Sequence, residues 1–307
     1  MIILEDVTFR YNPSDEPVLN RINMTIDDGA YVGIIGPNGC GKTTLVQHLN
    51  ALLYPVDGRV TVDGMNTDDE SCAGEIRRRV GMVFQNPDNQ IIGMTVEEDI
   101  AFGPGNLELP SVEIRKRVDE SLAMMGLYGY SQRQPYTLSG GEKRLVSIAG
   151  ILAMKPRYII FDEPTSYLDP SSRKRVLSII EKINKSGIGI IHITHNMDEI
   201  VNAGNIIVMN HGRIAFTGSP KEVFGTVERI KALKLDIPVA TELAWRLRQK
   251  GENIRTDILT IDEACLEIVG RLQSPRVSEG TQVRDRVETI TIQHIENKAI
   301  PGVKQHA

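Results

Sequence analysis

The chain has 307 residues, of which 41% are hydrophobic and 24% are charged, so it can bury a core as one large domain or one domain with a small appendage. Its formal net charge of -5 disfavours nucleic-acid binding, because nucleic-acid-binding proteins normally carry a basic surface. The apolar runs are too short to span a bilayer, the start does not resemble a signal peptide, and three widely spaced cysteines favour a reducing compartment over a disulfide or zinc framework.

The first part of the chain is expected to form short strands and one helix. Val7 and Phe9 alternate with polar residues, which is the period-two pattern of a half-buried strand. Leu45, Leu49 and Leu52 recur at helical spacing and predict a helix over 42–53. The other strands expected here lie at 21–27, 29–36 and 58–64.

Residues 86–137 have a helical character, with an amphipathic helix predicted at 111–127. Strands and helices then alternate again, and the strands are continuous runs of Ile and Val. Such runs, separated by helices, indicate a parallel sheet covered on both faces, and therefore an α/β fold. The elements expected in this part are strands at 157–164, 187–196 and 205–218 and a helix at 171–187.

The stretch "GPNGCGKT" fits the phosphate-loop pattern G-x-x-x-x-G-K-[ST]. Glycines let the backbone N–H groups curl around an anion, and the following helix presents its positive end to the phosphates. We expect Lys42 to reach the β/γ oxygens and Thr43 to offer a hydroxyl to Mg²⁺. The expected ATP-binding residues of this region are Gly36, Pro37, Asn38, Gly39, Cys40, Gly41, Lys42, Thr43 and Thr44.

The stretch "YIIFDEP" places two carboxylates at the end of a predicted strand, where open α/β sheets bind ligands. Asp162 is expected to hold the Mg²⁺ shell, and Glu163 to act as base or to orient an attacking water. Taken alone, the acidic pair could equally cap a helix. The phosphate loop upstream favours the catalytic interpretation.

A second glycine-rich helix start lies in "TLSGGEKRLVSIAGILAM". Ser139 is a suitable N-cap, and Gly140 and Gly141 expose backbone N–H groups. This second anion cradle lacks a lysine, which favours contact with a different nucleotide from the one held by the first loop. The alternative interpretation is a well-capped core helix.

Five motifs occur in the order found in the ATP-binding-cassette (ABC) ATPases, which the chain resembles over roughly residues 1–235. They are "GPNGCGKT", Gln85, "LSGGE", "IIFDEPTSYLD" and His195. The resemblance implies a phosphate-loop NTPase core with an antiparallel β subdomain and a helical subdomain at about 86–137. Residues 236–307 would form a small C-terminal extension.

The resemblance also implies roles for single residues. Tyr11 would stack on adenine, although it could also be an ordinary strand aromatic. Gln85 would approach Mg²⁺ and the attacking water, and His195 would contact the γ-phosphate. The implied catalytic set is Glu163, His195 and Gln85, and the implied metal contacts are Thr43, Gln85 and Asp162.

In the family, two subunits pair head to tail and enclose two ATP molecules. The phosphate loop of one subunit then faces the second subunit's Ser139, Gly140, Gly141, Glu142 and Asp169. The partner could be a second copy or a related ATPase. The family usually has glutamine at the position of Glu142 and often a basic residue at that of Leu145. We expect these two departures to affect the rate of ATP hydrolysis more than the ability to hydrolyse ATP.

The segment "QNPDNQIIG" at 85–93 is polar at one end and apolar at the other. In the family, Gln85 faces the nucleotide, whereas Asn86–Ile92 receives a transmembrane coupling protein. The residues of this stretch most resemble those at the same place in the ATPases of energy-coupling-factor importers. These importers take up vitamins or cobalt and nickel, and they also use a membrane substrate-binding protein. The resemblance implies a peripheral protein on the cytoplasmic side of the cell membrane, with Asn89 and Gln90 on the partner side.

Two other functions fit less of the sequence. Soluble ABC ATPases of DNA repair or translation typically carry a long coiled-coil insertion or two cassettes in one chain. A nucleotide-switch GTPase would need an N-K-x-D motif, and the "NKSG" that begins at Asn184 lacks the aspartate.

Two further features are open to interpretation. Cys40 lies at a helix N-terminus beside Lys42, which predicts a lowered pKa and a reactive thiolate, unless it is only a small residue that the loop tolerates. Near the C-terminus, Thr260 and Glu263 have capping-box spacing before a helical stripe that would pack internally or join a subunit interface. The stripe consists of Ile261, Cys265, Ile268, Val269 and Leu272. We assign no role to residues 273–307.

Overall fold

The computed structural model describes residues 1–273, and the segment beyond Gln273 lies outside the described residues. Compact packing extends from Met1 to Ile268, with residues 269–307 as a second unit. The expected boundary after residue 235 stays a prediction. Within the described residues no helix is both long and apolar enough to cross a membrane.

The first sheet is antiparallel and has the strand order β2-β1-β4-β5. Its strands are β1 (Ile2–Phe9), β2 (Leu19–Ile26), β4 (Asp57–Val62) and β5 (Met65–Asn66). Strands β1, β2 and β4 occur close to the expected places, whereas the two-residue strand β5 was not expected. Every second side chain of β2 is buried at its C-terminal half, as the alternating pattern predicts.

The second sheet has six strands in the order β10-β9-β3-β8-β7-β6. The five strands from β9 to β6 are parallel to their neighbours, and β10 joins the edge antiparallel to β9. The strands are β3 (Tyr31–Ile35), β6 (Val80–Val83), β7 (Tyr158–Asp162), β8 (Gly189–Ile193), β9 (Asn205–Asn210) and β10 (Arg213–Gly218).

Helices and the first sheet cover this second sheet, so its parallel strands bury side chains on both faces, whereas the edge strand β10 buries none of its residues. In β7, Ile159 and Phe161 belong to one core cluster, whereas Tyr158 and Ile160 belong to the other. The first cluster is shared with the helices α3 to α6, and the second with α1 and the antiparallel sheet. Burial on both faces explains why these strands are continuous apolar runs.

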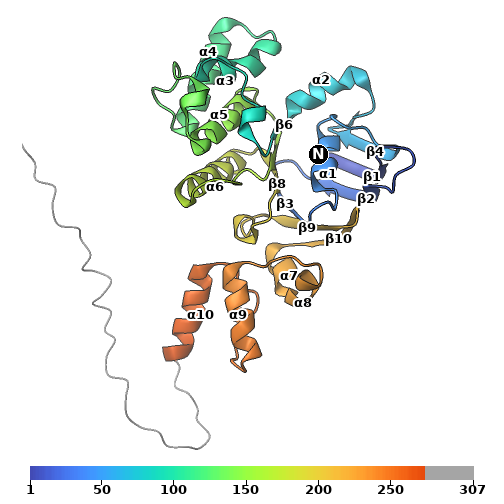
Figure 1. Ribbon diagram of the computed structural model, residues 1–307, viewed down its shortest axis with the longest axis vertical. Coiled ribbons are helices and arrows are strands. Elements are labelled where there is room, and N and C mark those ends of the chain that lie inside the picture. Colours follow the sequence, from blue (N-terminus) through green and yellow to red (C-terminus); the bar gives the residue numbers. More distant parts are fainter. Residues whose placement is uncertain (274–307) are drawn as a thin grey trace, which may run out of the picture. The chain divides into compact units, whose positions relative to one another are not determined.

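The helices that precede β8 are labelled in Figure 1, and those at 42–49, 111–125, 140–153 and 170–185 match expected helices. Helices α3, α4 and α5 pack against one another, and α5 also packs against α6. Their bounds are α1 (Lys42–Leu49), α2 (Glu70–Arg79), α3 (Val96–Asn106), α4 (Ser111–Met125), α5 (Gly140–Ala153) and α6 (Pro170–Lys185). Single 3-10 turns are η1 (Pro87–Asn89), η2 (Pro135–Thr137) and η3 (Met197–Glu199).

Helix α1 is shorter than its leucine spacing predicts. It ends at Leu49, and Ala51 has a φ of 54° in the left-handed region, which an α-helix does not allow. Leu52 is consequently exposed rather than part of the buried face.

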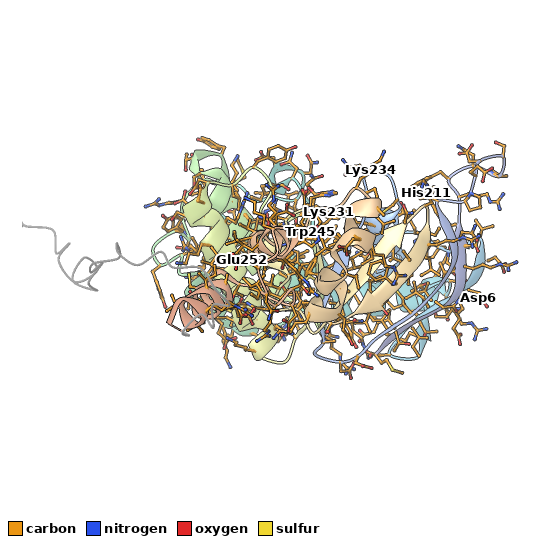
Figure 2. The ribbon with its side chains drawn as sticks, turned by 90° about the horizontal axis from the view of Figure 1, so that it is seen from below. Asp6, His211, Lys231, Lys234, Trp245 and Glu252 are labelled. Atoms are coloured by element: carbon orange, nitrogen blue, oxygen red, sulfur yellow. The ribbon has the colours of Figure 1, made fainter. Side chains whose placement is uncertain are left out.

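Four helices follow the second sheet: α7 (Pro220–Gly225), α8 (Val227–Ala232), α9 (Val239–Gln249) and α10 (Ile261–Gln273). Trp245 of α9 donates to Glu228 of α8 over 3.0 Å, and the Lys231 ammonium lies 3.9 Å from the centroid of the Trp245 ring. Lys231 and Trp245 are labelled in Figure 2, where their side chains lie next to each other. A cation over an indole face adds electrostatic attraction to this packing.

The capping box of α10 forms as expected, because the Glu263 carboxylate accepts from the Thr260 N–H and the Thr260 hydroxyl accepts from the Glu263 N–H. The expected stripe is mostly exposed: Ile261 is 68% exposed, and Cys265 is exposed as well. Ile268 packs against a small cluster that includes Ala264. The side chain of Leu272 lies outside the described part of the chain.

Candidate functional site

The phosphate loop connects β3 to α1 and is held in a conformation that glycine favours. Gly41 has a φ of 101°, and a Cβ at Gly36 would lie 2.5 Å from the carbonyl oxygen of Met209. The Lys42 ammonium reaches back over the loop and donates to the carbonyl oxygens of Gly36 (2.8 Å) and Pro37 (3.1 Å). The structure therefore places the lysine charge directly at the curled backbone.

The end of β7 meets the start of α1 through a hydrogen bond from the Thr43 hydroxyl to the Asp162 carboxylate, 3.0 Å long. Burial raises the pKa of Asp162, against the hydrogen bond from Thr43, and the negative charge of Glu163 raises it further. A buried carboxylate of this kind gains most from a nearby cation. The hydroxyl and carboxylate oxygens form a small set of hard ligands beside the lysine.

Three side chains from three segments meet at the Glu163 carboxylate. Gln85 donates to it from the segment after β6 over 2.8 Å. The His195 Nε2 atom, beyond the end of β8, lies 3.0 Å from it. Ser166 donates to the same carboxylate over 2.8 Å. The structure thus brings together the three residues expected to be catalytic.

Tyr11 lies at the edge of the phosphate-loop helix and is 59% exposed. Its hydroxyl is 3.0 Å from the Thr44 hydroxyl, and its ring makes an edge contact with Phe9 at a centroid distance of 5.0 Å. The aromatic side chain is therefore held near the loop and is largely exposed. The stacking role itself stays a prediction.

The second cradle forms the N-terminus of α5, where Ser139 and Glu142 make a capping box. The Glu142 carboxylate accepts from the Ser139 N–H over 2.8 Å and from the Tyr130 hydroxyl over 2.7 Å. These bonds lower the pKa of Glu142, with the Tyr130 hydroxyl as the largest cause. The carboxylate at the position of the family's usual glutamine is thus engaged within its own subunit.

Glycine is required at Gly141 by the neighbouring helix. A Cβ there would lie 2.4 Å from the Ser172 hydroxyl of α6. Asp169 is the N-cap of α6 and accepts from the N–H groups of Ser171 and Ser172. The Ser172 side chain, which also hydrogen-bonds the carboxylate, and these N–H groups lower the pKa of Asp169. The start of α5 and the start of α6 are therefore packed side by side.

Arg144 is a residue that sequence analysis did not single out. It follows the second cradle in α5, is 1% exposed, and donates from its two terminal nitrogens to the carbonyl oxygens of Phe84 and Gln85. Burial lowers the pKa of Arg144 to about 10, against the attraction of Asp162. Its only sequence signal is its position one residue before Leu145, where the family often has a basic residue.

The segment from Gln85 to Gly93 is held at several points. Lys143 of α5 forms a 2.6 Å ion pair with Asp88 in η1, and the buried Asp99 carboxylate accepts from the N–H groups of Ile92 (2.8 Å) and Gly93 (3.0 Å). A groove of about 260 Å³ lies beside it. Its lining includes Asp88, Ile91, Ile92, Met94, Tyr136 and Lys143.

Gln90, which we expected on the partner side, is half-buried, and its contact with a partner stays a prediction. Its side chain accepts from the N–H of Phe84 over 3.2 Å and donates to the carbonyl oxygen of Met82 over 3.3 Å. The Gln90 side chain thus makes the backbone hydrogen bonds that a neighbouring strand would make at the end of β6. Asn89, by contrast, is exposed. Sequence composition alone does not distinguish these neighbouring amides.

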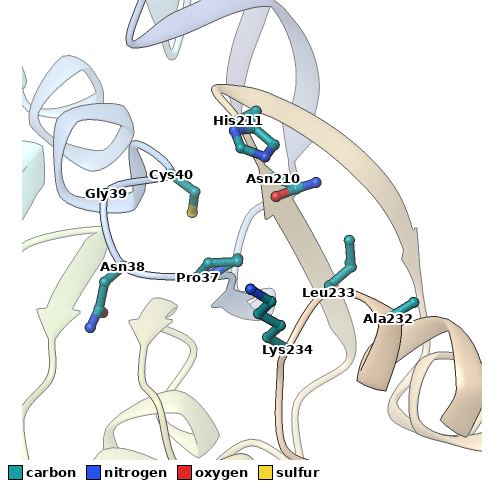
Figure 3. Close-up of a pocket in the computed structure, with 9 residues that line it drawn as sticks. All are labelled: Pro37, Asn38, Gly39, Cys40, Asn210, His211, Ala232, Leu233 and Lys234. Carbon is teal, nitrogen blue, oxygen red and sulfur yellow. The ribbon is translucent and has the colours of Figure 1, made fainter.

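Of the two interpretations of Cys40, the structure contradicts the reactive thiolate and leaves the small residue that the loop tolerates. The residue is 4% exposed, and burial raises the pKa of its thiol, although Lys42 acts in the opposite direction. Cys40 borders a cavity of about 290 Å³ together with His211 and Lys234 (Figure 3). The helix N-terminus and Lys42 lower the pKa of the Cys40 thiol less than the loss of solvation raises it.

The three thiols should therefore react in the order of their exposure. At pH 7.5 we expect a maleimide to modify Cys265 first, with little loss of ATP hydrolysis, because Cys40 is buried and mostly protonated. Cys265→Ser should remove the fast phase of labelling, measured by mass spectrometry. Cys40→Ser is the control and should leave that phase unchanged, and its loss in this variant would contradict the assignment.

Comparisons with known proteins agree with this geometry. Residues 19–166 match a family model described as ABC transporter. A cobalt import ATP-binding protein, CbiO of Syntrophus aciditrophicus, is 56% identical over 275 residues, which cover 90% of this chain and 98% of the relative. An energy-coupling factor transporter ATP-binding protein, EcfA1 of Clostridium perfringens, is 49% identical over 268 residues, covering 86% and 95%.

Solved structures show the same relationship. The structure of cbiO1 from Clostridium perfringens, part of the ABC transporter complex cbiONQ, superposes with a TM-score of 0.69 at 36% identity and covers 81% of this chain and 96% of that one. A dimeric ATP-binding cassette in a post-hydrolysis state with ADP and Pi gives 0.65 at 30% identity, covering 71% and 98%. The chain therefore belongs to the ABC transporter family, among the ATP-hydrolysing subunits similar to those of energy-coupling factor transporters.

Proposed function

We propose that this protein couples ATP binding and hydrolysis to solute import by a membrane complex of the energy-coupling factor type. The observation that carries the proposal is the convergence of Gln85 and His195 on the Glu163 carboxylate, beside Thr43 and Asp162. The names of the relatives support transport over DNA repair or translation. The transported solute is chosen by another protein of the complex.

ATP is held by the phosphate loop and Tyr11. Backbone N–H groups of 36–43 and the N-terminus of α1 face the β- and γ-phosphates, and Lys42 supplies a positive charge to their oxygens. Thr44 has its hydroxyl next to that of Tyr11, which orients the ring near the base. Stacking on such a ring contributes about 1–3 kcal/mol in comparable base–aromatic contacts.

Thr43 and Asp162 fit a magnesium ion that enters with ATP. Mg²⁺ prefers oxygen ligands, takes few of them from the protein, and fills its octahedron with water and phosphate oxygens. The two protein oxygens lie 3.0 Å apart, and the raised pKa of Asp162 falls again when a cation lies beside it. When bound, the ion neutralises charge on the phosphate oxygens.

Hydrolysis requires a water in line with the γ-phosphate. Glu163 orients this water and accepts its proton, Gln85 fixes the carboxylate from one side, and His195 stabilises the γ-phosphate from the other. The Ser166 hydrogen bond restricts the same carboxylate further. The three groups come from different strand ends, so their spacing depends on the sheet.

The second subunit completes each site. Ser139, Gly140 and Gly141 present the N-terminus of α5 to the γ-phosphate held by the partner's phosphate loop, and Asp169 lies at the junction. Closure around ATP and opening after hydrolysis form a two-state cycle. The partner is a second copy of this chain or a related ATPase.

The membrane partner docks on the groove beside Asn86–Ile92, where Ile92 and Met94 are exposed. Apolar side chains in a groove with a polar rim suit an amphipathic helix of a transmembrane coupling protein. Docking would hold this chain at the cytoplasmic side of the cell membrane and leave contact with the substrate-binding membrane protein indirect.

Glu163→Gln should slow ATP hydrolysis by about 10²–10⁴-fold while ATP binding persists. The substitution removes the proton acceptor but keeps the phosphate and magnesium contacts, so a closed dimer should accumulate with ATP. Steady-state phosphate release and size-exclusion chromatography measure the two effects. Glu120→Gln on the exposed side of α4 is the control, and a Glu163→Gln rate close to that of the control would contradict the assignment.

Asn89→Arg should weaken docking to the membrane partner and leave the ATPase rate of the isolated subunit within about twofold of wild type, because Asn89 is exposed, directly follows the groove residue Asp88 and is not one of the expected nucleotide-binding residues. Co-purification of membrane proteins and phosphate release give the two readouts. Asn253→Arg, at an exposed asparagine between α9 and α10, serves as the matched control. Unchanged docking of Asn89→Arg would place the partner elsewhere.

The exposed face of α10 is proposed to keep an open dimer together. Cutting the chain after Lys234 would also remove Leu235, Ile237 and Leu259 from the main core, so surface variants test the idea better. Ile261→Asp with Val269→Asp should shift the protein towards monomer in the absence of ATP, measured by light scattering, because both side chains belong to the stripe and are exposed. Lys250→Asp is the control, and a persistent dimer in the double variant would reject this interface.

A further inference from the structure

One buried carboxylate lies behind the site and takes no part in the proposed chemistry. Glu199, the last residue of η3, has a side chain that is 2% exposed. Its two oxygens accept from the Thr165 hydroxyl over 2.6 Å and from the Thr194 hydroxyl over 2.8 Å. A buried negative charge is costly unless several hydrogen-bond donors stabilise it. The Glu199 carboxylate therefore links its donors firmly to one another.

Both partners belong to segments that carry site residues. Thr165 lies two residues after Glu163, and Thr194 directly precedes His195. The Thr194 hydroxyl also accepts from the Asn196 N–H over 3.0 Å. This bond joins the two residues that flank His195 in the sequence. The segments of Glu163 and His195 are therefore connected twice: by the 3.0 Å contact between these two side chains, and by the hydrogen bonds of Thr165 and Thr194 to Glu199.

Two more elements reach the same carboxylate. The Nε2 atom of His192 in β8 lies 3.6 Å away, and its Nδ1 atom is 2.9 Å from the Tyr31 hydroxyl of β3. Arg173 in the first turn of α6 lies 3.7 Å from the carboxylate. Burial opposes ionisation of Glu199, yet the groups around it, His192 first, lower its pKa. The carboxylate is thus charged and shared by the strands and helix that carry the site.

We propose that Glu199 is a positioning residue, whose hydrogen bonds through Thr165 and Thr194 hold Glu163 and His195 at their catalytic separation. The inference rests on the proposed roles of that pair, which Glu163→Gln tests by itself. Small displacements of a reacting group lower turnover, because water and γ-phosphate must be aligned at once. ATP affinity depends instead on the phosphate loop and Tyr11, which Glu199 does not contact.

A merely structural role would lower stability without separating turnover from binding. The test therefore compares kcat for ATP hydrolysis, the dissociation constant for ATP and the melting temperature in the same variants. Thr165→Val and Thr194→Val each remove one hydrogen bond while preserving side-chain volume. Thr241→Val is the matched control, because Thr241 is also fully buried and donates to the Ile258 carbonyl oxygen in the packing of α9.

We expect Thr165→Val and Thr194→Val each to lower kcat about 10-fold or more, with the ATP dissociation constant within about twofold of wild type. Glu199→Ala should show the same separation, and Glu199→Gln should restore most of kcat, because an amide can still bond both hydroxyls. If Glu199→Ala does not fold, the threonine variants decide the question. The inference is overturned if both keep wild-type kcat, or if Thr241→Val lowers kcat as much as they do.

Discussion

Parallel hydrogen bonding among β3, β8 and β7 is the constraint on which the nucleotide site depends. Ile34 pairs with Ile193, and Ile193 pairs with Asp162, so the three strands end at one level of the sheet. The phosphate loop, His195 and Glu163 follow these strand ends within a few residues. A slip of one residue in this pairing would turn the side chains of a strand to the opposite face and separate the group.

Helix α5 connects this edge to two other surfaces. Its first turn is the cradle proposed to contact the partner's ATP, its next turn holds the carbonyl oxygen of Gln85 through Arg144, and Lys143 pairs with Asp88 beside the docking groove. Helix α5 therefore links the proposed dimer cradle, Gln85 and the groove through contacts within one subunit.

Local sequence context was a poor guide to titratable and amide side chains in this protein. Cys40 has the helix N-terminus and lysine neighbour that usually lower a thiol pKa, yet burial dominates and raises it. Gln90 and Asn89 are adjacent amides, but only Gln90 is used to complete the hydrogen bonds of β6. In both cases the deciding partners come from elements that are distant in the sequence.

The sequence by itself determined the α/β fold, most of the strands, the helices that follow the two glycine-rich turns, and the adjacent carboxylates Asp162 and Glu163 at a strand end. These features are local, because a glycine-rich turn between a strand and a helix, or a carboxylate after an apolar run, is complete within about ten residues. Only the tertiary structure decided the end of α1, the burial of Cys40, the orientation of Gln90 and the positions of Arg144 and Glu199. Each of these depends on burial and on hydrogen-bond partners from other segments, and desolvation and long-range pairing leave no fixed spacing in the chain.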